Sequence, residues 1–152
     1  MNADLRPDPD PQLLVDLAES GIALSATFGR CPDAPPGPPI IEQIGPPVRA
    51  AQATVHRLGG RIVVGSDAGI NTGKPHDVAP HALHQCLEIG MTPVEALAAL
   101  TSGGADALGL ASKGRLCAGA DADVVAVAGD LLADPGAVVR VERVWRLGQP
   151  VR

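Results

Sequence analysis

The segment of residues 61–71, RIVVGSDAGIN, limits the possible folds of this chain more than any other part of the sequence. Its apolar, β-branched run at 62–64 predicts a short buried strand that stops at Gly65. A carboxylate, Asp67, follows directly after that stop. Barrels of alternating strands and helices present their functional side chains just beyond the carboxyl ends of the strands. The segment therefore predicts a strand end at the rim of such a barrel, with Asp67 on that rim.

The overall charge and the cysteines narrow the range of partners and locations. The chain has 152 residues and a formal net charge of −5, which argues against nucleic acid or an anionic membrane as a partner. No apolar run approaches the ~20 residues of a membrane-spanning helix, and the first residues lack the basic and apolar segments of a signal peptide. The cysteines are odd in number and widely spaced, which predicts reduced thiols in a cytoplasmic protein.

Helix and strand patterns alternate up to about residue 110, and only strand patterns follow. The many prolines at 30–39 predict a loop. This order predicts an α/β fold in which residues 1–110 are a piece of an α/β barrel and residues 111–152 are a β-strand appendage. Helices are expected at 12–20, 48–58, 81–89 and from 93 onward, and strands at 22–27, 62–64, 114–116, 123–127 and 141–147.

The clearest local signal is the start of the helix after Gly90. Thr92 is suited to the N-cap, Pro93 to the first helical position, and Glu95 completes a capping box. The glycine pair at 103–104 is expected to divide this helix into two pieces.

Asp67 is the strongest candidate for chemistry. A carboxylate at a strand end can bind a divalent cation and can take a proton from metal-bound water. The sequence SDAG is equally suited to an Asx turn or a helix N-cap, and spacing alone leaves these alternatives open. The chain has no glycine-rich phosphate loop and no serine-nucleophile motif that would point elsewhere.

The histidines are weaker candidates, with one exception. His76 lies in the long loop at 65–80, from which it could reach a site above the strand ends, so we expect it to bind substrate. His81 and His84 share a helix face and are expected to be solvated or to cap the helix. His56 lies within an expected helix and is interpreted as a packed or surface residue.

Taken in order, these motifs resemble a known family. A strand ending in GSDAG is followed by a glycine- and proline-bearing loop, the helix GMTPVEALAALTSGGADALGL, a KGRL turn, GADADVVAVAGDLLADP and VWRLGQPV. This order resembles the C-terminal part of the amidohydrolase superfamily, specifically its imidazolonepropionase-like and Xaa-Pro dipeptidase-like metal-dependent hydrolases. The resemblance covers about residues 12–152 and is most specific over 61–127.

The resemblance implies a fold and a chemistry. Asp67 matches the aspartate that follows the eighth strand of a (β/α)8 TIM-type barrel, where it binds or lies beside the metal and accepts a proton from the attacking water. The segment 22–27 matches the seventh strand, and the KGRL and ADADVVAV segments match strands of a composite β-sandwich domain. The implied cofactor is a divalent metal, zinc, in the complete enzyme, and the implied substrate is a small molecule with an amide or cyclic amide C–N bond.

The resemblance also places most metal ligands on barrel strands that have no counterpart here. The family has an HxH pair on its first strand, and this chain has none. One carboxylate cannot hold zinc at useful affinity, so we expect the chain alone to be inert or nearly so, as a gene fragment or one part of a hydrolase with a missing N-terminal portion. Two alternatives stay open: a non-catalytic remnant that self-associates as a homo-oligomer or binds a partner, and an unrelated small α/β binding protein.

Overall fold

A computed structural model describes residues 9–151 of the chain, and its mixture of helices and strands has the α/β character that the sequence predicts. Residues 1–8 of the predicted 1–110 unit lie outside the described residues. None of the described helices combines the length and the apolar character needed to cross a bilayer. The elements run in the order α1 (Pro11–Glu19), β1 (Leu24–Ala26), α2 (Pro39–Arg57), β2 (Ile62–Val64), the 3₁₀ helix η1 (Ala79–His81), α3 (Ala82–Glu88), α4 (Pro93–Leu100), α5 (Ser102–Ala107), β3 (Val124–Val127), the 3₁₀ helix η2 (Pro135–Val139), β4 (Val141–Arg146) and β5 (Gln149–Pro150).

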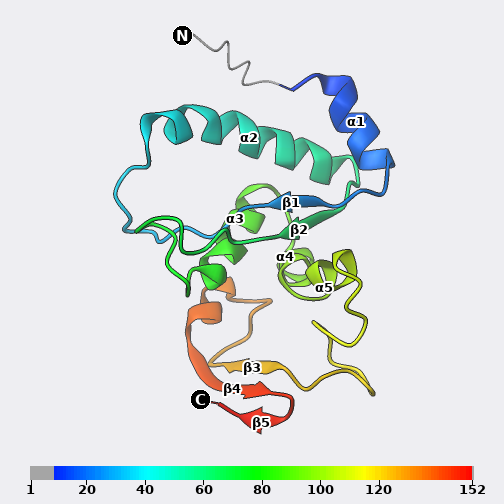
Figure 1. Ribbon diagram of the computed structural model, residues 1–152, viewed down its shortest axis with the longest axis vertical. Helices are drawn as coiled ribbons and strands as arrows, with labels where there is room; N and C mark the ends of the chain where they lie inside the picture. The colour runs from blue at the N-terminus through cyan, green and yellow to red at the C-terminus, as the bar shows by residue number, and fades with distance from the viewer. Residues whose placement is uncertain (1–8, 152) are drawn as a thin grey trace.

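The first strands, β1 and β2, form a parallel pair between two layers of helices (Figure 1). Leu24 pairs with Ile62 and Ala26 with Val64, so the carboxyl ends of both strands reach the same edge. The helix α2 runs along one side of the pair, and α3, α4 and α5 lie on the other. The core forms here because the strands and helices bring aliphatic side chains together away from water. Its fully buried members include Ala26, Val55, Leu83 and Cys86.

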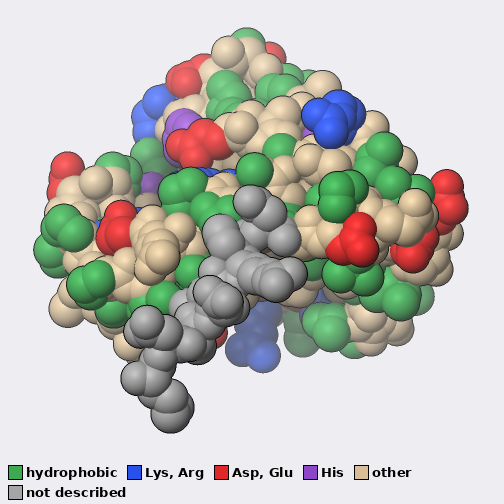
Figure 2. Space-filling model, turned by 90° about the horizontal axis from the view of Figure 1, so that it is seen from above, with side chains coloured by type: hydrophobic (Ala, Val, Ile, Leu, Met, Phe, Trp, Pro, Cys, Tyr) green, Lys and Arg blue, Asp and Glu red, His purple; other side chains and the backbone are tan. Residues whose placement is uncertain are grey.

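Many residues of α2 are exposed, and Figure 2 shows the molecule from the side on which α2 lies. The view onto this face shows apolar side chains dispersed among charged ones, and Ile40, Ile41 and Val48 are the exposed large apolar residues that α2 contributes. Scattered apolar side chains of this kind are normal on a protein surface.

The helix α2 begins much earlier than the predicted 48–58 helix. Pro38 is its N-cap and Pro39 occupies the first turn, where the missing N–H of proline breaks no helical hydrogen bond. Two more prolines, Pro46 and Pro47, lie inside the helix and each removes one backbone donor. The sequence pattern treats these interior prolines as a boundary, which is why the predicted start was wrong.

The predicted start of α4 is confirmed in atomic detail. The hydroxyl of Thr92 accepts from the amide of Glu95 at 3.3 Å, and the Glu95 carboxylate accepts from the amide of Thr92 at 2.8 Å. The predicted break at residues 103–104 was wrong, because α4 ends at Leu100 and the glycine pair lies inside α5. The break is at Thr101, whose φ of −128° and ψ of −95° are not helical.

The last part of the chain forms a three-stranded antiparallel sheet in the order β3-β4-β5. The strands predicted at 123–127 and 141–147 are confirmed, and β5 adds a short return after the turn at Leu147 and Gly148, both with positive φ. The strand predicted at 114–116 was wrong: Gly114 lies in a bend and the next two residues lie in a loop. Gly114 has a left-handed φ of +69°, and no described strand pairs with these residues to supply ladder hydrogen bonds.

Candidate functional site

Asp67 lies three residues beyond the end of β2, at the edge where both parallel strands finish. The amide of Gly65 donates to the carbonyl of Ala26 at 3.0 Å, so the two strands stay joined up to that edge. Asp67 is exposed and has a left-handed backbone with φ of 53°, a conformation that aspartate tolerates better than most residues. The structure therefore presents this carboxylate beyond the strand ends and toward solvent.

Asp67 neither caps a helix nor closes an Asx turn. No helix begins at this residue, which is followed by a turn at Ala68 and Gly69. Within residues 9–151 its carboxylate accepts no hydrogen bond from the protein. A helix N-cap or an Asx turn would have used one of its oxygens, and both oxygens are free to meet a ligand.

Lys74 is the residue of this site that sequence reasoning missed. Its ammonium donates to the carbonyl of Thr27 at 2.6 Å and to the carbonyl of Ser66 at 2.8 Å. These carbonyls lie just beyond β1 and β2, so one side chain spans the ends of both strands. Burial lowers the pKa of Lys74, the negative charge of Asp67 acts to raise it, and the positive charge of Arg30 lowers it further.

The loop that carries Lys74 is closed by backbone hydrogen bonds. The amide of Gly69 donates to the carbonyl of Lys74 at 2.6 Å, and the amide of Lys74 donates to the carbonyl of Asn71 at 3.0 Å. The carbonyl of Gly73 accepts from the amide of Cys31 at 2.9 Å, which attaches the loop after β2 to the loop after β1. The two loops therefore form a connected layer over the strand ends.

His76 lies against the same loop. A Cβ atom added to Gly69 would stand 2.7 Å from Cε1 of the His76 imidazole, so the ring packs directly over this glycine. Gly69 is two residues from Asp67 along the chain, and His76 itself is exposed. The structure thus places His76 on the layer that holds Asp67, although its predicted role in binding substrate stays a prediction.

The other histidines lie elsewhere. His56 is half-buried, and its Nε2 atom is 3.9 Å from the carboxylate of Glu95. His81 occupies the N-cap position of α3 without a capping hydrogen bond from its side chain, and His84 is exposed. Both line a hollow of about 240 Å³ that does not include Asp67, formed by Arg30, Cys31, Pro32, His81, His84, Gln85 and Glu88.

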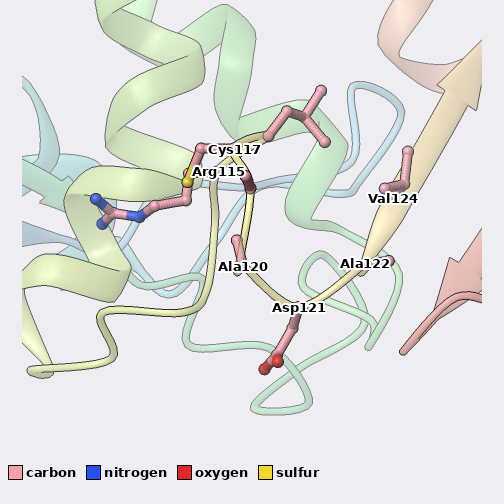
Figure 3. Close-up of a pocket in the computed structure, with 8 residues that line it drawn as sticks. Arg115, Cys117, Ala120, Asp121, Ala122 and Val124 are labelled. Atoms are coloured by element: carbon pink, nitrogen blue, oxygen red, sulfur yellow. The ribbon is translucent and has the colours of Figure 1, made fainter.

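A second hollow, of about 390 Å³, lies within the loop before β3 (Figure 3). In Figure 3 the side chains of Arg115 and Asp121 point in different directions, and each is paired, with Asp106 and with Lys113 respectively. Polar groups that diverge in this way do not form the convergent set of a binding site. The residues that line this second hollow are Arg115, Leu116, Cys117, Ala118, Ala120, Asp121, Ala122 and Val124.

A metal site needs several ligand side chains close together. Across residues 9–151, no three His, Cys, Asp or Glu side chains gather closely enough to hold a metal ion. Zinc takes three or four protein ligands, and Asp67 supplies one carboxylate. The residues described here therefore do not fit a complete metal site. The buried Cys86 is not a ligand candidate either, because burial raises the pKa of its thiol to about 11.

Comparison with known proteins identifies the family of this chain. A model of the amidohydrolase family matches residues 14–151, which is nearly the whole chain. The chain therefore belongs to the amidohydrolase family, as the sequence motifs predicted.

The individual relatives match over shorter stretches. The chain is 58% identical over 40 residues to an imidazolonepropionase of Anaeromyxobacter sp. (strain K), covering 26% of this chain and 10% of that protein. It is 54% identical over 39 residues to an imidazolonepropionase of Pseudoalteromonas atlantica (strain T6c / ATCC BAA-1087), again covering 26% of this chain and 10% of the relative. The chain thus matches about a tenth of the length of these relatives.

Solved structures show a similar fold over most of the chain. A Xaa-Pro dipeptidase with bound methionine superposes with a TM-score of 0.67 at 23% identity, over 75% of this chain and 28% of the dipeptidase. The ochratoxinase of A. niger superposes with a TM-score of 0.72 at 23% identity, over 96% of this chain and 35% of that enzyme. This chain therefore corresponds in fold to about a third of such proteins.

Proposed function

We propose that this chain is the C-terminal portion of a metal-dependent hydrolase that acts on the C–N bond of small amides or cyclic amides, with Asp67 as general base and metal ligand. The observation that carries the proposal is the position of Asp67, an exposed residue beyond the ends of two parallel strands whose carboxylate accepts no hydrogen bond from residues 9–151. Membership of the amidohydrolase family supports this chemistry.

The proposal includes an architecture. Strands β1 and β2 are the last two strands of a (β/α)8 barrel within residues 1–110, and residues 111–152 contribute the strands of a composite β domain. The similar solved structures are about three times as long as the matched region, which leaves room for the other strands in a longer protein. We assign the remaining metal ligands to that missing portion, because Asp67 alone cannot hold the ion.

The residues of this chain have distinct roles in the proposed reaction. The Asp67 carboxylate accepts a proton from a water molecule as the water oxygen forms a bond to the carbonyl carbon of the amide. The protonated carboxyl group then gives this proton to the leaving nitrogen as the C–N bond breaks, which returns Asp67 to its charged form. His76, on the adjoining part of the loop, offers an imidazole that can hydrogen-bond to the substrate.

The test uses the longest reading frame that contains this chain, taken with its in-frame upstream DNA. The protein is purified with zinc or manganese and assayed on dipeptides, N-acyl amino acids and lactams. Asp67→Asn removes the base while keeping the shape of the side chain, and we expect kcat to fall by about 10²- to 10⁴-fold. Asp77→Asn is the matched control, because Asp77 is an exposed aspartate of the same loop, and we expect it to change kcat less than twofold.

Two results would contradict the proposal. One is turnover that survives in Asp67→Asn while the circular dichroism spectrum stays that of the wild type. The other is an upstream reading frame that encodes an unrelated protein and yields no hydrolysis with either metal.

A further inference from the structure

We propose that Lys74 is a positioning residue that holds Asp67 in place by binding the backbone on both of its flanks. This inference deepens the proposed function, since it rests on Asp67 being the functional carboxylate. The role of Lys74 in this proposal is to restrain the backbone on either side of Asp67.

The first flank is held by the side chain of Lys74. Its ammonium donates to the carbonyl of Ser66 at 2.8 Å, and this carbonyl belongs to the peptide group that leads into Asp67. The same ammonium donates to the carbonyl of Thr27 at 2.6 Å, which anchors it to the end of the neighbouring strand β1. The orientation of the Ser66–Asp67 peptide plane is thereby fixed against a second strand rather than left to the loop.

The second flank is held by the backbone of Lys74. Its carbonyl accepts from the amide of Gly69 at 2.6 Å, two residues after Asp67. Lys74 is therefore hydrogen-bonded to the backbone on both sides of Asp67, at Ser66 and at Gly69. Because a lysine ammonium has three donors on a flexible stem, it can meet two carbonyls that diverge from separate strands.

The need for such a restraint follows from the backbone of Asp67. Its φ of 53° lies in the left-handed region, which is unfavourable for L-residues in general and which aspartate tolerates better than most. Conformations of this kind persist where the surrounding contacts determine them. The two bonds from Lys74 supply these contacts, and Lys74 is itself half-buried, so the ammonium has given up part of its hydration to make them.

The test begins with the wild-type chain and nuclear magnetic resonance. We expect the ammonium nitrogen of Lys74 to show through-hydrogen-bond couplings to the carbonyl carbons of Thr27 and Ser66. The variant Lys74→Met keeps the length of the side chain but removes its donors. In this variant we expect the amide shifts of residues 66–69 to change and the strong intraresidue amide–α-proton NOE of Asp67, which marks a positive φ, to weaken.

The matched control is Lys113→Met, which changes the one other lysine of the chain, whose ammonium pairs with Asp121 and Asp123 instead. We expect it to leave the signals of residues 66–69 unchanged. In a longer, active protein, Lys74→Met should lower kcat by about 10- to 100-fold with a much smaller change in KM, because a misplaced base affects the chemical step more than binding.

The proposal is overturned if the strong intraresidue NOE of Asp67 is unchanged in a folded Lys74→Met variant. If that variant does not fold, the wild-type couplings decide, and their absence overturns the proposal. These spectroscopic results need neither metal nor substrate. A failure of the positioning role is therefore distinguishable from a failure of the proposed hydrolase activity.

Discussion

Two parts of this molecule are stabilised in different ways. Among the described residues, every buried hydrophobic side chain except Ala137 belongs to the region from Ala26 to Ala105, which contains the parallel pair and its helices. The region from Lys113 to Val151 has ion pairs instead, and Lys113 lies 2.8 Å from Asp121 and 2.6 Å from Asp123.

The contrast bears on where a functional site can be built. Burial of apolar surface is the larger stabilising contribution in a folded chain, whereas exposed ion pairs typically add about 0–1 kcal/mol each. Asp67 and Lys74 both stand at the end of the strands that the apolar core supports. The antiparallel sheet is joined to the region of the parallel pair mainly through η2, which contacts α3 and η1. We therefore expect removal of the sheet to disturb the candidate site less than a change in the core.

The largest expected effect comes from a cavity in that core. Leu83 is fully buried, so Leu83→Ala should lower the free energy of unfolding by about 2–5 kcal/mol, as measured with urea. Leu116→Ala removes the same atoms from a side chain that is 85% exposed, and a change within about 0.5 kcal/mol is expected. Equal losses from the two variants would refute the division into a core-stabilised region and an ion-paired region.

An intermediate effect is expected at the junction of the two regions. Gly114 has φ of +69°, and a Cβ atom there would lie 2.6 Å from the backbone carbonyl group of Thr101. Backbone atoms cannot yield cheaply, so Gly114→Ala should destabilise the protein by more than about 1 kcal/mol in urea unfolding.

Gly119→Ala is the matched control for this junction. Gly119 has a similar φ of +86° but open space where its Cβ would stand, so this variant bears only the cost of the backbone conformation. If Gly114→Ala is no worse than Gly119→Ala, the contact with Thr101 does not couple the two regions.

The smallest effect is expected from the ion pairs themselves. Hydrogen bonds from Lys113 hold the pKa values of Asp121 and Asp123 below their usual range, and the same bonds raise the pKa of Lys113. The stabilisation of the folded state by these ion pairs is therefore complete between about pH 4 and pH 10. It is lost as the pH falls through the lowered aspartate values or rises through the raised lysine value.

Thermal unfolding of Lys113→Met tests this pH dependence. The melting temperature should be slightly below that of the wild type at pH 7, and the difference should vanish near pH 2. Arg143→Met, which changes an exposed residue of the same sheet, should show no such dependence. A difference for Lys113→Met that is independent of pH would contradict the assignment of the stabilisation to these pairs.

The features predicted correctly from sequence are local ones. The capping box of Thr92 and Glu95 is complete within four residues, and the β-branched run of β2 ends at its glycine as predicted. The strand expected at 114–116 failed because a strand needs a neighbour, and sequence alternation does not supply one.

The candidate site was predictable only in part, for the same reason. The position of Asp67 beyond a strand end could be predicted from the pattern of strand, glycine and acid on one short segment, whereas its role stays a prediction. The partners of Lys74 could not, because Thr27 lies 47 residues away and becomes a neighbour only when β1 and β2 pair. For a lysine in a glycine-rich loop, no sequence pattern shows whether its side chain contacts the strand ends or is solvated.

The close approach of His76 to Gly69 has an evolutionary consequence. Alanine at position 69, the smallest replacement available, already places a methyl carbon 2.7 Å from the imidazole, and the φ of +92° disfavours any L side chain. A side chain at position 69 is therefore strained by its backbone whichever residue occupies position 76. We expect related sequences to keep glycine at position 69.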